Sequence, residues 1–429
     1  MKILHVSRSD GGGGAQRASL RLHRAMLGAG MPSRMLVVDR KSDDPTVTGP
    51  SSLAARLWGM IRPRLVETPL KGLDGQPPWA TRSFNLLPTG MHRVINASDA
   101  DIVHLHWVGN ETISIREIGR IEKPIVWTLR DMWPFSGSLH YEAIDAETRQ
   151  RAGYPPLPMT RRTIAPLDLD RWTHRRKLSA WRDLDLHIVG LSHWIAEAAR
   201  QSELFGHRPV TRIPNTIDLE RFHPRNRATA RQIIGLPEDA RIILFGAVGG
   251  GRDPRKGATL LYRALDEVWQ ALAPDERART MAVLYGSSVG RADGEGMPVR
   301  ALGRFEDDAS LALLHAAADL FVAPSVQENL PNTVIEAAAC GRPAIAFDIG
   351  GMPDVIRHGE TGFLVPLGDV SALARHLRDM LVDDGLRERL GHGARRHAEA
   401  SFAPQHVLPA YAALYADVLA ARGRAAHKW

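Results

Sequence analysis

Two glutamates stand eight positions apart in the stretch ENLPNTVIE, which begins with Glu328 and ends with Glu336. A pair of carboxylates can act as general acid and base, bind a metal ion, or be solvated surface charge. Between them lies Pro331, which has no amide hydrogen and therefore suits the first turn of a helix. The pattern predicts a helix from about residue 331 to Cys340 that ends at Gly341.

This helix start gives the two carboxylates different positions. Glu328 precedes the helix on a loop, whereas Glu336 lies inside it, beyond the first turn. Free amides of Asn332, Thr333 and Val334 would point back past Glu328, so an anion there would meet amides and the positive end of the helix dipole. Both glutamates could then accept hydrogen bonds from hydroxyl groups. The stretch predicts a polyol–phosphate site and not a metal site, because no Asp-x-Asp pair accompanies it. The alternative is a first-turn charge worth about 0.3–1 kcal/mol.

A glycine-rich basic loop, LFGAVGGGRDPRKGA (244–258), has features of a second phosphate site. Arg252, Arg255 and Lys256 come just before a helix that should begin near Ala258. Cations and a helix N-terminus at one point suit a diphosphate. The order Gly-Lys-Ser/Thr of a P-loop is missing. A solvent-exposed basic turn is the alternative.

Four glycines at residues 11–14 follow the first predicted strand and would let backbone amides approach a phosphate. A dinucleotide-binding fingerprint needs glycines at relative positions 1, 3 and 6. Counted from Gly11 the sixth residue is Gln16, and counted from Gly12 it is Arg17. The fingerprint fails, which disfavours a nicotinamide-dependent enzyme, and a flexible turn is the other interpretation.

The elements that must position these loops alternate along the chain. Short apolar runs and helical patterns form two series that meet near residue 215, a rhythm typical of βαβ units on parallel sheets. The predicted strands are 2–7, 33–38, 101–108, 123–130 and 186–192, then 240–248, 281–287, 299–305, 319–325, 342–348 and 361–366. We therefore predict two doubly wound α/β halves, with ligands at the carboxyl ends of the strands and in the cleft between the halves.

Three segments depart from this rhythm. Residues 131–185 contain many polar and turn residues and predict a long loop over the cleft. Residues 51–66 predict a helix packed on its own domain, and binding to an anionic membrane is the alternative. Its apolar side chains near one face are Leu53, Leu57, Trp58, Ile61 and Leu65. Residues 404–423 are helical with Pro409 inside, which predicts a kink.

The composition limits the class of protein. The chain has 429 residues, a formal charge of +7 and one cysteine, Cys340, which excludes a disulfide framework and fits a reducing cytoplasm. The charge favours anionic ligands, but the basic clusters lack the interleaved aromatic residues of single-strand binders, so no nucleic-acid partner is expected. No apolar run is long enough to span a membrane, and the N-terminus predicts a strand and not a signal peptide.

These motifs resemble family 4 glycosyltransferases, retaining enzymes of the GT-B fold. The resemblance covers nearly the whole chain and is strongest in the second half. HLHW (104–107) and WTLRDMWPFSG (127–137) are similar to the branch that builds exopolysaccharide, capsule or lipopolysaccharide repeat units, colanic-acid-type enzymes among them. The other matching stretches are GGAQR (13–17), IPNTIDLERFHP (213–224), DPRKG (253–257), ALGRFEDDASLALLHAAADLFVAPS (301–325), ENLPNTVIEAAACGRPAIAFDIGGMPDVI (328–356) and GETGFLVP (359–366).

The resemblance implies two domains and a role for each matching residue. Residues 1–215 would bind the acceptor, with 410–429 packing back on them, and residues 216–409 would bind the nucleotide-sugar donor. Glu336 would accept the ribose hydroxyls, Glu328 would bind hydroxyls of the transferred sugar, and Lys256 would neutralise the diphosphate. The other donor-side residues would be Gly13, Gly14, Arg252, Arg304, Phe305, Asn329, Leu330, Pro331, Asn332 and Thr333. Neither a metal nor another cofactor is expected, because cations and helix dipoles would stabilise the leaving diphosphate.

Two positions depart from the family pattern. The family often has an arginine six residues before the lysine of the diphosphate loop, where this chain has Gly250; Arg252 or Arg255 would have to replace it. The family's histidine in the motif matching WTLRD is Arg130 here, which is permanently charged and cannot be a general base near neutral pH. Either Arg130 binds an anionic group, such as a uronate or phosphate, or a nearby histidine takes over.

The nearby histidines are His104 and His106, which lie two apart on one predicted strand and so share a face. We expect them to line the cleft, and a metal-binding pair is the alternative. The predicted catalytic residues are Glu328, Arg130 and His106. His104, Trp107 and Asp131 are predicted on the acceptor side.

The implied reaction transfers a sugar from a UDP- or GDP-linked donor to a glycan or polyprenyl-diphosphate-linked acceptor, with retention of configuration. The leaving phosphate would deprotonate the acceptor, so Glu328 would orient the sugar and not attack it. A nucleotide-sugar epimerase and an inactive sugar-nucleotide-binding protein stay open, whereas hydrolysis by the glutamate pair would need no diphosphate loop. The expected location is the cytoplasm, with peripheral binding at the inner face of the plasma membrane as an extension of it.

Overall fold

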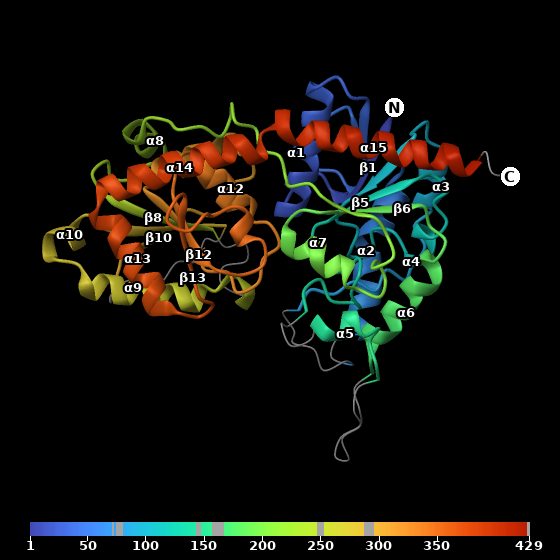
Figure 1. Cartoon of the computed structure of the whole chain (residues 1–429), viewed down its shortest axis with the longest axis horizontal. Helices are drawn as coiled ribbons and strands as arrows, with labels where there is room; N and C mark the ends of the chain where they lie inside the picture. The colour runs from blue at the N-terminus through green and yellow to red at the C-terminus, as the bar shows by residue number, and fades with distance from the viewer. Residues whose placement is uncertain are drawn as a thin grey trace, which may run out of the picture. The chain divides into compact units, whose positions relative to one another are not determined.

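The computed structural model describes residues 1–70, 73, 80–142, 147–156, 167–246, 253–286 and 296–426, without the side chains of 147–148 and 424–426. The chain forms two compact units (Figure 1). Unit 1 is Met1–Ile213 together with Leu408–Trp429, and unit 2 is Pro214–Val407. The sequence analysis expected these boundaries at residues 215 and 409.

Unit 1 is built on a seven-stranded parallel sheet of order β3-β2-β1-β4-β5-β6-β7. Its strands are β1 (Ile3–Ser9), β2 (Ser33–Asp39), β3 (Val47–Thr48), β4 (Ile102–Leu105), β5 (Ile125–Leu129), β6 (Leu186–Gly190) and β7 (Val210–Arg212). The five predicted strands are confirmed. Strands β3 and β7 were not predicted, because two or three residues are too short to show a strand pattern.

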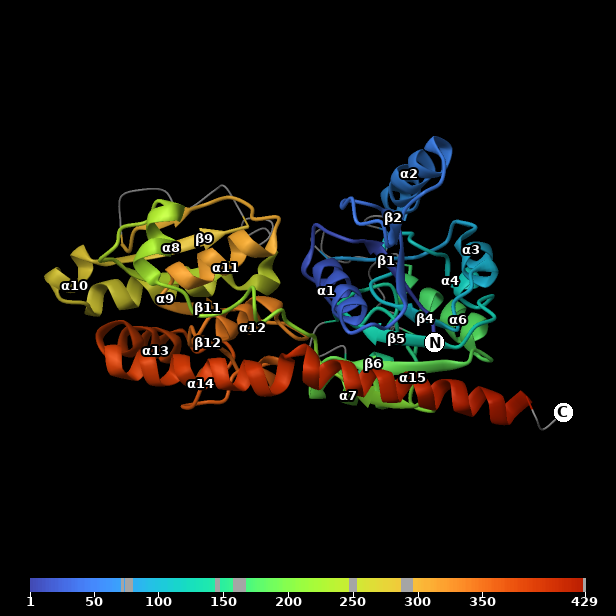
Figure 2. The ribbon, with the colours of Figure 1, turned by 90° about the horizontal axis from the view of Figure 1, so that it is seen from above.

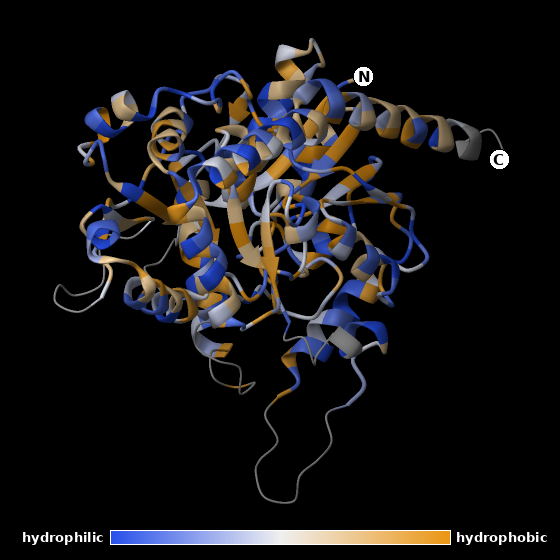
Figure 3. Cartoon of the chain, turned by 60° about the vertical axis from the view of Figure 1, so that its left-hand side comes forward, coloured by the Kyte–Doolittle hydropathy of each residue, from blue (hydrophilic) through white to orange (hydrophobic). Residues whose placement is uncertain are grey.

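Helices cover this sheet, whose apolar strands are visible as orange arrows in Figure 3. The core residues Val103, Leu105, Ile125, Trp127 and Ile188 are fully buried, as expected for strands covered on both faces. The helices are α1 (Gly14–Gly28), α2 (Leu53–Leu70), α3 (Met91–Ala97), α4 (Ile115–Ile118), α5 (Glu147–Arg151), α6 (Leu169–Trp181) and α7 (His193–Arg200).

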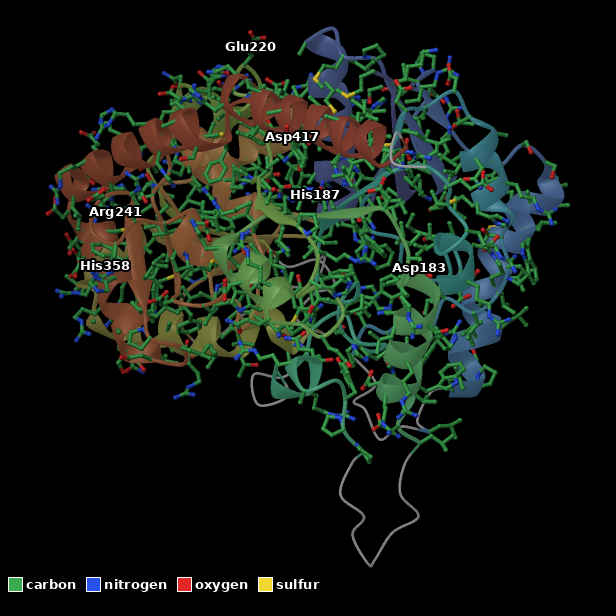
Figure 4. All side chains as sticks on the ribbon, turned by 45° about the vertical axis from the view of Figure 1, so that its right-hand side comes forward. Asp183, His187, Glu220, Arg241, His358 and Asp417 are labelled. Carbon is green, nitrogen blue, oxygen red and sulfur yellow. The ribbon has the colours of Figure 1, made fainter. Side chains whose placement is uncertain are left out.

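The C-terminal helix α15 (Pro404–Ala426) contains Pro409 and belongs to unit 1 from Leu408 onward. Its Tyr411 and Tyr415 are buried in that unit. Figure 4 labels Asp417 on α15 and His187 on β6. Burial lowers the pKa of His187, and the negative charge of Asp417 acts in the opposite direction. The predicted kink at Pro409 stays a prediction.

The prediction of one long loop over residues 131–185 is wrong. Residues 131–140 are all buried in unit 1, and α5 and α6 are helical segments of the same range. Residues 143–146 and 157–166 of the predicted loop lie outside the described residues. The buried Lys177 of α6 holds the buried segment, because its ammonium group donates hydrogen bonds to the carbonyls of Trp133, Ser136 (3.1 Å) and Gly137 (2.7 Å). Burial lowers the pKa of Lys177 well below its ordinary value. Polar composition misled the prediction because polar groups can be buried when they find partners inside the unit, as the three carbonyls bound by Lys177 do.

The helix predicted at 51–66 is confirmed as α2, and it packs on its own unit as predicted, but not through its apolar face. Its apolar face is exposed, and Gly59, Arg62, Pro63 and Val66 are the buried positions. A Cβ atom on Gly59 would lie 2.9 Å from Val38 of β2, so the missing side chain lets the helix backbone approach the sheet there. Among the described helices, none is long and apolar enough to cross a membrane.

Unit 2 has a six-stranded parallel sheet of order β10-β9-β8-β11-β12-β13. Its strands, β8 (Arg241–Gly246), β9 (Thr280–Tyr285), β10 (Val299–Ala301), β11 (Leu320–Ala323), β12 (Ala344–Phe347) and β13 (Gly362–Val365), confirm the six predictions. The helices are α8 (Arg227–Ile234), α9 (Ala258–Ala271), α10 (Pro274–Ala278), α11 (Asp308–Ala317), α12 (Asn332–Ala339), α13 (Val370–Val382) and α14 (Asp384–Phe402), with one-turn helices η2 (Pro254–Lys256) and η3 (Met352–Asp354).

Candidate functional site

An ion pair joins the two predicted phosphate loops of unit 2. The Lys256 ammonium group lies 2.5 Å from a carboxylate oxygen of Glu328, a residue 72 positions away in the chain. The side chain of Lys256 is 33% exposed and that of Glu328 is 14% exposed, so an external ligand can reach the pair. Lys256 ends η2 directly before α9, and Glu328 lies on the loop between β11 and α12.

Close backbone packing fixes both ends of this pair. Gly257 has a positive φ of 66°, and a Cβ atom there would lie 1.8 Å from the carbonyl oxygen of Pro324. Gly350, at a φ of 51°, would place a Cβ atom 1.9 Å from the carbonyl oxygen of Glu328. The amide of Val326 also donates to the carbonyl of Arg255 at 2.8 Å. Only glycine fits at the two tight positions, so the loops hold one geometry.

The start of α12 differs in detail from the prediction. Pro331 is extended and precedes the helix instead of lying in its first turn. The amide of Val334 donates to the Pro331 carbonyl at 3.2 Å, so the prediction that this amide is free is wrong. The side chain of Asn332 accepts a hydrogen bond from Asn215 at 2.8 Å. The helix ends as predicted, with Cys340 as the capping residue and Gly341 at a φ of 70°.

The remaining residues of unit 2 that were predicted on the donor side differ in their contacts and in their burial. Arg255 is held by Asp253 through contacts of 2.7 and 3.0 Å, which occupies its guanidinium group. Arg252 and Gly250 lie outside the described residues. Among the others, Arg304 is exposed, Phe305 and Thr333 are half-buried, and Asn329, Leu330 and Pro331 are buried.

Glu336 lies in a different environment from Glu328. It is 3% exposed, and one carboxylate oxygen lies 3.4 Å from a ring nitrogen of the fully buried His315 on α11. The His315 ring also lies edge-on to Tyr285, at 6.1 Å between centroids. Sequence reasoning missed His315. The only signal was a histidine on the apolar side of a predicted helix, which is more often a packing residue than a ligand.

In unit 1, the predicted phosphate-binding glycines start a helix at the end of β1. Gly13 is extended and caps α1, and Gly14 is the first residue of that helix. Gly12 has a φ of 94°, a conformation that glycine adopts without strain. The amide of Arg17 donates to the Gly13 carbonyl at 3.0 Å, which closes the first turn.

Two residues of unit 1, Arg130 and His5, contact the ring of the predicted catalytic residue His106. Arg130 donates from Nη2 to His106 Nδ1 at 3.2 Å, and His106 Nε2 lies 2.8 Å from His5 Nδ1. Arginine can only donate, so His106 carries its hydrogen on Nε2 and donates to His5. Burial lowers the pKa of His106 well below 6.5, with smaller effects from His104 and Arg130. His106 is therefore a neutral ring whose two nitrogens both have protein partners.

His104 lies in the interior beneath α15 and not on an open surface. It is fully buried, with Nδ1 at 2.6 Å from the Tyr415 hydroxyl and Nε2 at 2.7 Å from the Thr128 hydroxyl. Burial lowers its pKa well below 6.5. The neighbouring guanidinium of Arg130 keeps its charge, because burial lowers its pKa only to about 10.

The alternative of a metal site at these histidines is disfavoured by their geometry. In the described chain, the ring nitrogens of His5, His104 and His106 lie within 4.8 Å of one another. Tetrahedral zinc at about 2.0–2.1 Å from each nitrogen separates its ligands by about 3.3 Å. The contact of 2.8 Å between His5 and His106 is a direct hydrogen bond, and the charge of Arg130 beside it would repel a cation.

Trp107 and Asp131 belong to a second buried network in unit 1. Asp131 Oδ2 accepts from the Trp107 indole at 2.6 Å and from His140 Nδ1 at 2.5 Å. His140 Nε2 lies 2.7 Å from the Ser83 hydroxyl. This order resembles a Ser-His-Asp relay, but Ser83 is 1% exposed and its oxygen accepts the amide of Asn110 at 2.7 Å. The network therefore positions Asp131 and Trp107 and presents no nucleophile.

The two parallel-sheet, Rossmann-like units are those of the GT-B fold of glycosyltransferases. Sucrose-phosphate synthase from Thermosynechococcus elongatus has a TM-score of 0.64 at 20% identity, covering 98% of this chain and 100% of that chain. Anabaena Alr3699/HepE in complex with UDP-glucose has a TM-score of 0.62 at 16% identity, covering 98% and 100%. At these identities the likeness shows the fold.

Within this fold, residues 241–383 match the family model described as Glycosyl transferases group 1. They contain Lys256, Glu328 and Glu336. The D-inositol 3-phosphate glycosyltransferase of Streptomyces bingchenggensis is 37% identical over 220 residues, which cover 47% of this chain and 46% of that protein. The match thus spans less than half of that relative's length. Its name points to an inositol phosphate glycosyltransferase and not to the exopolysaccharide branch that the motifs resemble.

Proposed function

We propose that this chain is a retaining, metal-independent glycosyltransferase that uses a UDP- or GDP-linked sugar. The observation that carries the proposal is the Lys256–Glu328 pair, at the start of α12 and inside the segment that matches the glycosyltransferase family. Lys256 neutralises the leaving diphosphate, and Glu328 holds hydroxyls of the transferred sugar. Glu336 holds the ribose. The complex of HepE with UDP-glucose supports a nucleotide-sugar donor.

The proposed division of labour follows the two units. Unit 2 binds the donor, and unit 1 binds the acceptor with Arg130 as its anion-binding residue. Burial and the contact with His106 hold the Arg130 guanidinium in one orientation, which favours recognition of a fixed acidic group. His106 positions Arg130 and takes no proton itself.

Two acceptor classes satisfy this arrangement. The first is a glycan or polyprenyl-diphosphate-linked saccharide of surface polysaccharide synthesis, used at the inner face of the plasma membrane. The second is a phosphorylated cyclitol, which the relative's name favours. The lipid diphosphate of the first class and the phosphate of the second each supply an acidic group that Arg130 would bind, and an assay with each acceptor separates them.

Donor binding tests the first half of the proposal. Thermal unfolding of the full chain is measured with UDP, GDP and their glucose and mannose conjugates, beside the variant Lys256→Gln. We expect one nucleotide series to raise the midpoint by several degrees and the variant to lose most of that shift. No shift with any nucleotide, or the same shift in the variant, would overturn the donor assignment.

Radiolabelled donor with a lipid extract or with inositol 3-phosphate tests the second half. A glycosyltransferase moves the label to the acceptor. An epimerase changes the donor sugar without an acceptor, and a binding protein does neither, so each of these outcomes rejects the proposed activity.

A further inference from the structure

Helix α2 of unit 1 exposes an apolar face that its own fold leaves uncovered. Figure 2 shows the helix beside β2 at the edge of that unit. Six large apolar side chains of this single helix are between 38% and 72% exposed: Leu53, Leu57, Trp58, Met60, Ile61 and Leu65. They make up nearly half of the large apolar side chains that are exposed among the described residues.

The exposed side chains form one continuous face. At about 100° per residue they span roughly 160° of the helix, and the buried positions Gly59, Arg62 and Val66 centre on the opposite side. The buried side already contacts unit 1, because Gly59 abuts Val38 and Val66 packs with Phe84. The apolar face therefore points away from the body of unit 1.

Basic residues accompany this face. By the same helical count, Arg64 lies within the apolar arc and Arg56 lies about 40° beyond one edge of it. Both are exposed, and neither side chain forms a hydrogen bond or ion pair with any described residue. A long arginine side chain can lay its carbons on apolar surface and extend its charge to a layer of phosphates.

A hollow of about 740 Å³ adjoins the same helix. Arg56 and Met60 of α2 line it on one side. The hollow is lined by four basic residues, which are Arg56 together with Arg8, Arg40 and Lys41. Two acidic residues, Asp39 and Asp43, also line it. The balance of charge favours an anionic group beside the apolar face.

We propose that α2 docks on an anionic phospholipid bilayer. The helix lies in the plane of the interface with its apolar face at the boundary between headgroups and acyl chains, and Arg56, Arg64 and the hollow contact lipid phosphates. A second copy of this chain fits the face less well, because a symmetric contact would bury Arg64, which lies within the apolar arc, in both copies. The formal charge of +7 of the whole chain also attracts it to an anionic membrane.

Vesicle sedimentation of the full chain without substrates tests this inference, so its outcome is independent of the proposed reaction. Vesicles of phosphatidylcholine alone are compared with vesicles of about seven parts phosphatidylcholine to three parts phosphatidylglycerol. We expect binding to the anionic vesicles only, weakened by high salt.

Two variants locate the contact. The triple variant Leu57→Ser, Ile61→Ser, Leu65→Ser should reduce binding about a hundredfold, because three apolar side chains no longer enter the interface. The double variant Arg56→Gln, Arg64→Gln should reduce it about tenfold or more and remove the preference for anionic lipid. All five side chains are exposed, so the thermal midpoint should not change.

The matched control is Val94→Ser, Ile233→Ser, Leu367→Ser, which removes three apolar side chains of similar exposure elsewhere and should leave vesicle binding unchanged. Binding by the triple α2 variant at the original level would overturn the proposal, as would failure of the unaltered chain to bind anionic vesicles. A dimer in sedimentation velocity that the triple variant dissolves, without vesicle binding, would assign the face to a second copy and also overturn it.

Discussion

The two units treat their charged residues in opposite ways. In unit 2, Lys256 and Glu328 form an ion pair that is partly exposed at the start of a helix. In unit 1, His104 and His106 are buried and held by hydrogen bonds to their neighbours. A ligand can replace the contacts of the first group at little cost, whereas the second group is part of the fold.

Because of this difference, substitutions in the two units should separate effects on function from effects on stability. Changing the exposed pair should alter ligand binding and turnover with little effect on folding. Changes among the buried histidines should alter the free energy of unfolding first. The predictions below test that contrast.

The largest effect is expected for Glu328→Ala. Transfer at saturating donor should fall about a hundredfold while the Kd for the free nucleotide changes little, because the carboxylate is proposed to contact the sugar. Radiolabel turnover and calorimetry measure the two quantities. Glu360→Ala, whose side chain is 71% exposed, is the matched control. Near-normal turnover in Glu328→Ala would show that this residue does not orient the sugar.

The next effect is a pH dependence of stability to which His23 of unit 1 contributes. His23 is fully buried between the hydroxyls of Ser33 and Thr46, and burial lowers its pKa to about 4. The unfolded chain takes up this proton near pH 6.5, so the stability from the neutral ring is present above pH 6.5. It is lost as the pH falls from 6.5 to about 4, by up to about 3 kcal/mol.

Urea unfolding at several pH values measures this loss by tryptophan fluorescence, since Trp269 is the only tryptophan of the sequence within unit 2. His23→Gln should reduce the slope of stability against pH between pH 6.5 and 4 without removing it, because the buried His104 and His106 keep their lowered pKa values. His406→Gln, at an exposed position, should leave the slope unchanged. An unaltered slope in His23→Gln would assign the acid sensitivity to other groups.

A smaller effect is expected for Tyr415→Phe. The hydroxyl lies 2.6 Å from His104 Nδ1, and its removal leaves a buried nitrogen without that partner. We expect unit 1 to lose about 1–3 kcal/mol of its free energy of unfolding, with nucleotide binding by unit 2 unchanged. A large loss of nucleotide affinity instead would mean that this buried contact of unit 1 affects the donor site.

The smallest effect on stability is expected for Lys256→Gln. Because the ion pair is partly exposed, the free energy of unfolding should change by about 0.5 kcal/mol or less, while donor affinity falls about tenfold. Lys2→Gln, which breaks an exposed pair with Asp99, is the control for both measurements. A loss of stability above about 2 kcal/mol would make the pair structural, and the contrast between the units would fail.

The sequence by itself determined the local elements and where the loops that carry Lys256 and Glu328 lie between them. Eleven predicted strands are present because a strand in a parallel sheet is a short apolar run that can be recognised within a few residues. Gly341 ends α12 as predicted, since a positive φ is a local requirement that glycine meets. The predicted roles of Glu328 and Glu336 rest on the same local pattern together with the family resemblance.

Only the tertiary structure decided which distant residues meet and which faces are covered. Lys256 and Glu328 are 72 positions apart, and His104 and Tyr415 are 311 apart, so neither contact leaves a periodic signal in the chain. The pattern of α2 identified side chains that share a face, but not whether the fold would cover it. Periodicity reports neighbours along one element, whereas burial depends on what the rest of the chain packs against that element.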